Sequence, residues 1–237
     1  MNISHSHKII WWAPEKTASK ATAYVLSKYD FYYYDEWLKD DIKKLCEPYH
    51  SHKLIYPEEF NDYQLICSIR NPYDRILSFF NNFSGLKVVY TKDNKEYFKT
   101  RLENFIKELF FDEIIRRHRP KSENAPNLQN YLMKNLYDGK IPDKYIKMES
   151  LVEDLGNLDF IKDSEMWKNG FFTDFLAKND YIKKRPYQFY DVYSKTAAKI
   201  VYEYFKKQFF VCNYDPFSFT KDELTDEEKK NFLHDTL

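Results

Sequence analysis

The feature that most constrains the fold is a short apolar run, residues 63–69 (YQLICSI), which ends directly at Arg70-Asn71-Pro72. A short apolar run bounded by polar residues is typical of a buried strand. Asparagine followed by proline predicts a helix start, with Asn71 as the N-cap and Pro72 in the first helical position. This part of the chain therefore predicts a strand, a tight turn and a helix that continues through Phe80.

The same order of elements is predicted near the N-terminus, where residues 8–12 (KIIWW) form a strand and residues 18–28 a helix. Residues 29–41 predict a strand or a loop that leads into a short helix. The remaining patterns predict a strand at 144–148 and helices at 97–117, 127–136, 149–155 and 194–209. Strands that alternate with helices favour an α/β fold with a mainly parallel sheet.

One domain over residues 1–237 is expected, because the chain contains no Gly/Ser-rich or Pro-rich linker. Residues 1–7 and about 221–237 are polar, and we expect them to be peripheral tails. The first residues lack the apolar core of a signal peptide, and no run is long enough to span a bilayer. A cytoplasmic location is therefore expected.

Three cysteines, Cys46, Cys67 and Cys212, are far apart and fit no zinc spacing, so they predict buried, reduced thiols and no metal site. The formal net charge is zero, which argues against a nucleic-acid binder. Aromatic residues make up 19% of the chain. That excess indicates either the codon bias of an AT-rich genome or an aromatic-lined site for a sugar or a base.

Two cations, Lys16 and Arg70, follow two predicted strands. Ligands of parallel sheets bind at the carboxyl ends of the strands, so we expect both cations at one edge, facing a doubly anionic ligand. The turn around Lys16 precedes a helix N-terminus, which attracts phosphate. Lys16 is then placed to stabilise charge on a leaving oxygen. A solvated turn is the alternative interpretation.

Arg70 emerges from a buried strand, where its guanidinium can grip a phosphate with two parallel bonds. Ser78 lies about two turns into the following helix and can donate a hydroxyl bond toward the same pocket. The alternative for Arg70 is a buried structural salt bridge. For Arg75 we favour a surface ion pair with Asp74 or a nearby acid.

Together these residues, Lys16-Thr17-Ala18-Ser19 followed by Arg-Asn-Pro-x-x-Arg-x-x-Ser at 70–78, resemble the sulfotransferases that use 3′-phosphoadenosine-5′-phosphosulfate (PAPS), and most of all their carbohydrate branch. The resemblance implies a P-loop-like three-layer sandwich, a central, mainly parallel sheet flanked by helices. It assigns the 3′-phosphate to Arg70 and Ser78. It assigns the 5′-phosphosulfate to the first loop, namely Lys16, Thr17, Ala18, Ser19 and Lys20.

The first loop departs from the family pattern, because Glu15 stands where proline is usual and Lys20-Ala21 replaces a hydroxyl pair. The hydroxyl that contacts the 5′-phosphate is therefore either Ser19 or, in reserve, Thr22. Residues 145–155 and 187–214 also resemble family segments, a strand before an acidic helix start and a C-terminal helix with its closing turn.

A general base is needed, since transfer to an alcohol requires removal of the hydroxyl proton, and histidine suits that role near neutral pH. Residues 49–52 (YHSH) resemble the His-x-His of uronyl 2-O-sulfotransferases. That resemblance makes His52 the base and His50 a second residue at the substrate. The alternatives are exposed loop histidines, with a carboxylate of the acceptor region as the base: Glu36, Asp40 or Asp41.

Two basic segments complete the candidate residues. By resemblance, a residue of 183–185, with Lys184 and Arg185 foremost, closes over the 3′-phosphate; a solvated loop is the other interpretation. Residues 116–121 are expected to complement a helix dipole, with an anionic acceptor as the alternative.

The sequence thus predicts transfer of a sulfuryl group from PAPS to a hydroxyl-bearing acceptor, which the resemblance suggests is a glycan. 3′-Phosphoadenosine-5′-phosphate (PAP) is the expected product, and no metal is required. A P-loop kinase is the first alternative, although the chain lacks Gly-x-x-x-x-Gly-Lys-Ser/Thr. The second is an inactive module that binds a nucleotide or a glycan.

Overall fold

The computed structural model describes residues 2–14, 16–35, 40–45, 60–83, 90–116, 141–178 and 187–234. By its contacts the chain divides into two compact units, each of which is described by itself. Unit one comprises Met1–Arg70 and Lys134–Lys184, and unit two comprises Asn71–Met133 and Arg185–Leu237. Whether the two units form a single domain depends on how they associate, so the expected single domain stays a prediction.

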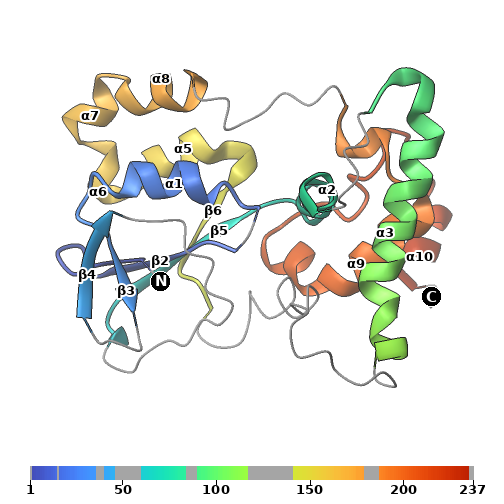
Figure 1. The fold of residues 1–237 in the computed structure, drawn as a ribbon, viewed down its shortest axis with the longest axis horizontal. Coiled ribbons are helices and arrows are strands. Elements are labelled where there is room, and N and C mark those ends of the chain that lie inside the picture. Colours follow the sequence, from blue (N-terminus) through green and yellow to red (C-terminus); the bar gives the residue numbers. More distant parts are fainter. Residues whose placement is uncertain are drawn as a thin grey trace. The chain divides into compact units, whose positions relative to one another are not determined.

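Unit one contains a six-stranded sheet with the strand order β4-β3-β1-β2-β5-β6 (Figure 1). Strand β2 pairs in parallel with β5, and β5 pairs in parallel with β6. The other three pairings, β1 with β2, β1 with β3 and β3 with β4, are antiparallel. The strands are β1 (Asn2–Ser4), β2 (Ile9–Trp12), β3 (Tyr32–Asp35), β4 (Asp40–Leu45), β5 (Gln64–Ile69) and β6 (Lys144–Lys147).

The α/β class is confirmed, and the predicted parallel arrangement holds for β2, β5 and β6. The sheet as a whole is mixed, where the sequence predicted a mainly parallel one. The difference arises because the first turn, residues 5–8, is too short for a crossover and reverses the chain from β1 into β2.

Helices of unit one pack against the sheet through a shared apolar cluster that includes Trp11, Ile66 and Leu155. In Figure 1 they lie together over one face of the sheet. They are α1 (Ser19–Leu26), α5 (Leu151–Gly156), α6 (Asp159–Lys162), α7 (Glu165–Lys168) and α8 (Phe171–Lys178), with the 3-10 helix η3 (Met148–Ser150) before α5.

Residues expected to form a polar N-terminal tail are instead part of the sheet. Asn2–Ser4 is a fully buried strand, and Ile3 is completely enclosed. The expectation of a peripheral tail at 1–7 was wrong because pairing on both sides, with β2 and β3, satisfies the backbone of a segment whose side chains are mostly polar. In the same way, Asp40–Leu45 is a strand where a short helix was expected.

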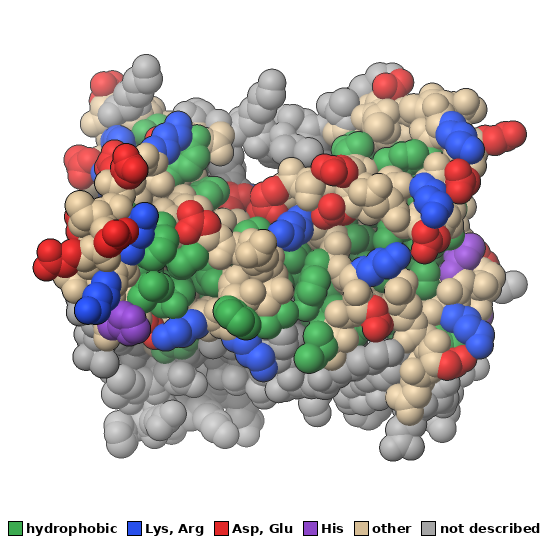
Figure 2. Space-filling model, turned by 180° about the vertical axis from the view of Figure 1, so that it is seen from behind, with side chains coloured by type: hydrophobic (Ala, Val, Ile, Leu, Met, Phe, Trp, Pro, Cys, Tyr) green, Lys and Arg blue, Asp and Glu red, His purple; other side chains and the backbone are tan. Residues whose placement is uncertain are grey.

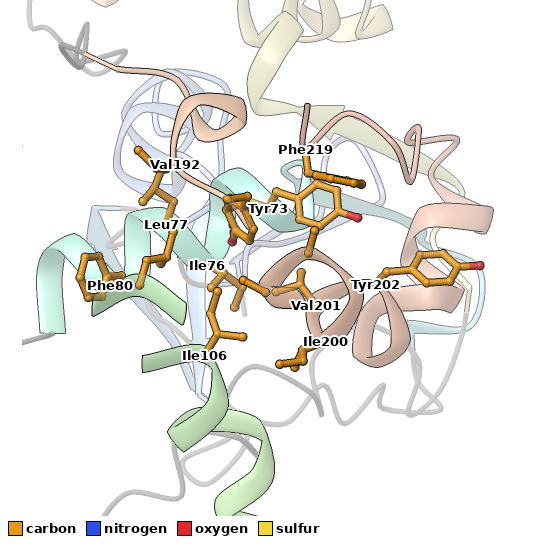
Figure 3. Close-up of a cluster of buried hydrophobic side chains, with 14 of the residues drawn as sticks. Tyr73, Ile76, Leu77, Phe80, Ile106, Val192, Ile200, Val201, Tyr202 and Phe219 are labelled. Atoms are coloured by element: carbon orange, nitrogen blue, oxygen red, sulfur yellow. Dashed lines mark hydrogen bonds between the residues drawn. The ribbon is translucent and has the colours of Figure 1, made fainter. Parts of the chain in front are cut away.

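Unit two is helical, with α3 and α9 packed against each other and against α2. Its elements are α2 (Pro72–Phe83), η2 (Lys92–Asn94), α3 (Lys95–Arg116), η4 (Phe189–Asp191), α9 (Lys195–Val211) and α10 (Asp226–His234). Figure 3 shows Ile76 of α2 and Val201 of α9 pointing toward one another, with Tyr73 and Phe219 beside them. The helices predicted at 97–117 and 194–209 are confirmed within a few residues.

Local capping signals in unit two are also confirmed. The Asn71 side chain accepts a bond from the backbone N–H of Tyr73 at 3.0 Å, at the start of α2. The Ser194 hydroxyl accepts one from the backbone N–H of Ala197 at 3.1 Å, at the start of α9. Both helices therefore begin where the sequence predicted, because an N-cap acts through neighbouring backbone and needs little tertiary context.

Two expectations for unit two were wrong. Arg75 does not lie on the surface: it is fully buried, on the face of α2 that also carries Phe79. The segment expected to be a C-terminal tail contains α10, whose Phe232 is buried in the core cluster. Phe232 and the partly buried Leu233 attach this polar helix to the core, and hydropathy averaged over the segment hides them.

Several expectations fall on residues that the structure does not describe, among them the helix at 127–136. Cys67 and Cys212 are buried thiols, as predicted, and Cys46 lies outside the described residues.

Within the described ranges, no helix has the length and apolar character needed to cross a bilayer. Acidic and basic side chains are interspersed on the face drawn in Figure 2.

Candidate functional site

The candidate site lies where the parallel strands β2 and β5 of unit one end. Their register pairs Trp12 with Cys67, so β5 continues past the end of β2 toward the same edge. The loop with Lys16 follows β2, and Arg70 follows β5 directly. The two cations are therefore at one edge of the sheet, as the strand–turn–helix pattern predicted.

Arg70 is in direct contact with the first loop. Its Nη1 donates to the backbone carbonyl of Lys16 at 3.1 Å, and the whole residue is only 5% exposed. A guanidinium carries five donors in a fixed fork, and this bond uses one of them. The bond ties the end of β5 to the backbone of the loop that follows β2.

The loop itself has an unusual backbone. Lys16 and Ala18 both adopt left-handed conformations, with φ of 64° and 59°. Residues with a Cβ rarely adopt this region, which costs about 1–2 kcal/mol each. Between them, the buried hydroxyl of Thr17 donates to the carbonyl of Pro14 at 2.6 Å. Strain held by a specific hydrogen bond is typical of functional loops.

Helix α1 begins directly after this loop, and its N-cap, Ala18, provides no side-chain cap. The first backbone N–H groups of a helix have no partner within the helix, and together they carry a partial positive charge. A left-handed residue followed by helical residues also turns successive N–H groups toward one concave surface that suits an anion. The start of α1 thus has the chemistry of a phosphate site.

The two hydroxyls proposed for this site differ in their environment. The Thr22 hydroxyl is enclosed and donates to the carbonyl of Ala18 at 3.2 Å, inside the helix. Ser19 is the first residue of α1 and is 7% exposed. The Thr22 hydroxyl is therefore already bonded within α1, and the role of Ser19 at the 5′-phosphate stays a prediction. Lys20, the next residue, is exposed.

Beneath the loop lies a polar contact that the sequence reasoning missed. The indole N–H of Trp11 donates to the hydroxyl of Ser68 at 2.9 Å, and both side chains are fully buried. This bond joins β2 to β5 just before the two strands end. The signal was weak, because a serine inside an apolar strand is explained only when its partner on the adjacent strand is known.

At the third parallel strand, Asp154 organises the start of α5. Its carboxylate accepts from the backbone N–H of Lys147 at 2.6 Å and from the hydroxyl of Ser150 at 3.0 Å. The acidic helix start noted in the sequence therefore closes the turn after β6. Asp154 acts here as a structural residue.

The other predicted site residues are not brought together by the described structure. Ser78 belongs to unit two, two turns into α2 and partly buried, so its role at the 3′-phosphate stays a prediction. The side chains of Asp40 and Asp41 on β4 are not described. Five predicted residues lie outside the described ranges: Glu36, His50, His52, Lys184 and Arg185.

Comparison with known proteins finds no relative, so any functional proposal has to rest on the residues and the geometry described above. The chain matches no family model, no curated protein and no solved structure. Among the described residues, no group of three or more His, Cys, Asp or Glu side chains is arranged to hold a metal ion. What the site offers chemically is a strained loop, a helix N-terminus and a buried guanidinium beside them.

Proposed function

We propose that the chain is a PAPS-dependent sulfotransferase that sulfates a hydroxyl group, with a glycan as the acceptor. The observation that carries the proposal is the 3.1 Å bond from the Arg70 guanidinium to the Lys16 carbonyl at one edge of a parallel strand pair. The proposal requires the segments after β2 and β5 to bind the same bisphosphorylated nucleotide. A direct contact between these two segments supports that requirement.

In the proposed reaction the acceptor oxygen attacks sulfur, and the bond from sulfur to the 5′-phosphate oxygen breaks. PAP leaves with the electron pair, and Lys16, together with the N–H groups at the start of α1, stabilises the charge that develops on that oxygen. Arg70 and Ser78 hold the 3′-phosphate. His52 accepts the acceptor proton. We also propose that the fold is a P-loop-like three-layer sandwich, as the resemblance to the sulfotransferases implies.

Calorimetry with PAP tests the nucleotide site. Removal of a charge-assisted, two-bond contact in Arg70→Ala should weaken PAP binding by about 30-fold or more, equivalent to roughly 2 kcal/mol. AMP, which lacks the 3′-phosphate, should bind the unchanged protein with a similar loss. Arg101→Ala, on α3 of unit two, is the matched control and should bind PAP normally.

Arg70→Lys separates phosphate binding from loop support, because it keeps the charge but loses the planar fork. Intermediate PAP affinity with an unchanged melting temperature would support a phosphate contact. Equal affinity of the unchanged protein for PAP and AMP would exclude the proposed site. Incubation with PAPS and a panel of glycans, followed by mass spectrometry for added sulfate, then tests transfer.

A non-catalytic binding module is the second candidate. The observation that favours it is the Thr17 hydroxyl, which is buried against the Pro14 carbonyl and so is turned inward rather than toward a ligand. PAP binding without sulfate transfer to any acceptor would favour this function. A P-loop kinase has less support, since no glycine occupies residues 13–22.

A further inference from the structure

A second surface, at the C-terminal end of α9 in unit two, is not used by the proposed reaction. Phe210 is 88% exposed there, and the adjacent Val211 is 36% exposed. Single exposed apolar residues are common, but a phenyl ring that projects almost entirely into water beside a second apolar residue costs hydration free energy. A binding partner that removes Phe210 and Val211 from water would recover that free energy.

Positive charge lies beside these two apolar residues. Lys206 and Lys207 are both exposed and precede them by one helical turn. The Lys206 ammonium group lies 5.5 Å from the centre of the Tyr202 ring, which is within the range of a cation–π contact. Among the described residues, the adjoining pocket of about 570 Å³ has no acidic side chain in its lining. It is lined by these lysines together with Tyr202, Phe209, Phe210, Asn213, Tyr214 and Pro216.

The turn that ends α9 makes this surface rigid. Asn213 adopts a left-handed conformation with φ of 52°, the backbone N–H of Asn213 donates to Phe210 and that of Tyr214 donates to Phe209 at 2.9 Å. This pair of bonds is a Schellman motif, which stops the helix and satisfies its last carbonyls. The exposed ring is therefore held at a defined helix end rather than on a frayed one.

We propose that the surface formed by Lys206, Lys207, Phe210 and Val211 docks onto an anionic lipid bilayer. A ring that projects outward is covered completely by the interface of a bilayer, whereas a small ligand inside the pocket would cover only one of its faces. Amphipathic helix ends use this combination, an apolar side chain in the acyl boundary and lysines at anionic headgroups. The inference goes beyond sulfuryl transfer and does not depend on it.

Vesicle sedimentation tests the inference with the full chain. The protein should pellet with vesicles of about 30% phosphatidylserine in phosphatidylcholine, because the anionic lipid gives the surface a negative potential. It should remain in solution with vesicles of phosphatidylcholine alone. Bound protein should be released by high salt, because exposed charges are screened. No sedimentation with anionic vesicles would overturn the inference.

Variants locate the contact. Phe210→Ala should reduce the partition coefficient about tenfold or more, and Lys206→Gln with Lys207→Gln about tenfold or more. The matched controls are Tyr97→Ala, which removes another exposed ring, and Lys229→Gln with Lys230→Gln, which removes the same charge from α10. Equal losses in the controls would show unspecific attraction and sink the proposal.

Insertion of the ring is tested directly with Phe210→Trp, a substitution that an 88% exposed position tolerates. Lipids brominated in the acyl chain should quench the added indole fluorescence, and the parent protein should show little quenching. Competition by soluble glycerophosphoserine would indicate a headgroup pocket instead, and would contradict docking onto a bilayer. PAP binding by all these variants should be unchanged, so failure here is distinct from failure of the sulfotransferase proposal.

Discussion

The two units use polar groups in opposite ways. In unit two, tyrosine hydroxyls inside an aromatic core donate to backbone carbonyls: Tyr73 to Pro216 at 2.6 Å, Tyr193 to Tyr73 at 2.9 Å and Tyr204 to Phe110 at 2.6 Å. In unit one, polar groups gather at the strand ends, around a loop with two left-handed residues. The comparison teaches that the aromatic side chains in the described core of unit two serve as structure, while Lys16 and Arg70 of the proposed anion site lie in unit one.

Burial also changes the acid–base properties of these tyrosines. Burial raises the pKa of Tyr73 well above the ordinary value of 10.0, and the neighbouring Tyr193 and Asp215 raise it further. The hydroxyl therefore stays protonated and continues to donate to Pro216. The core of unit two is therefore built with the Tyr73 hydroxyl in its neutral form.

The largest expected effect tests whether the units unfold together. Phe98→Ala removes a fully buried ring from unit two and should cost about 3–5 kcal/mol of unfolding free energy. Leu155→Ala, its counterpart in unit one, should cost about 2–5 kcal/mol. Urea unfolding followed by circular dichroism and calorimetry gives both values.

Under the single-domain prediction, both substitutions shift one shared transition. Two transitions, each sensitive to only one of the substitutions, would replace that prediction with two independent domains.

A smaller effect is expected beneath the candidate loop. Trp11→Phe leaves the buried Ser68 hydroxyl without its donor and should cost about 1–3 kcal/mol. Adding Ser68→Ala to Trp11→Phe should restore part of that loss, because the stranded polar group is then removed. Chemical denaturation of the two single variants and the double variant measures the coupling. Strictly additive losses would mean that the bond has no part in joining β2 to β5.

Helix capping should contribute about 1 kcal/mol in unit two. Ser194→Ala removes the N-cap of α9 and the bond from its hydroxyl to Glu103. Ser194→Thr keeps a hydroxyl and should retain most of the stability, as measured by thermal unfolding. If the threonine variant were as unstable as the alanine variant, side-chain packing rather than capping would account for the loss.

The smallest effect is a pH dependence. Hydrogen bonds from Lys107 and Ser194 lower the pKa of Glu103 below its ordinary value of 4.5. The unfolded state then binds more protons than the folded state between the two values, so this stabilisation is present above about pH 4.5 and is lost as pH falls through the folded pKa. Glu103→Gln should therefore differ from the parent at pH 7 and converge with it in acid. A difference that persists in acid would contradict this assignment.

Local sequence signals predicted more of the helices than of the sheet. Asn71-Pro72 and Ser194 fixed two helix starts, and the apolar runs before Ala13 and Arg70 located β2 and β5. Strand β1 was missed because its residues become strand-like only when β2 and β3 lie on either side. Arg75 was misjudged since a charge predicts exposure, whereas its position four residues before the buried Phe79 places it on the same buried face of α2.

By itself, the sequence determined that two apolar strands each end in a cation and then a helix, because strand, cap and turn preferences act over a few residues. Only the tertiary structure decided that the guanidinium of residue 70 bonds the carbonyl of residue 16, that the Thr22 hydroxyl bonds the Ala18 carbonyl, and that the sheet is mixed. These depend on strand register and on which buried polar groups find partners, and neither is encoded within a short window of the chain.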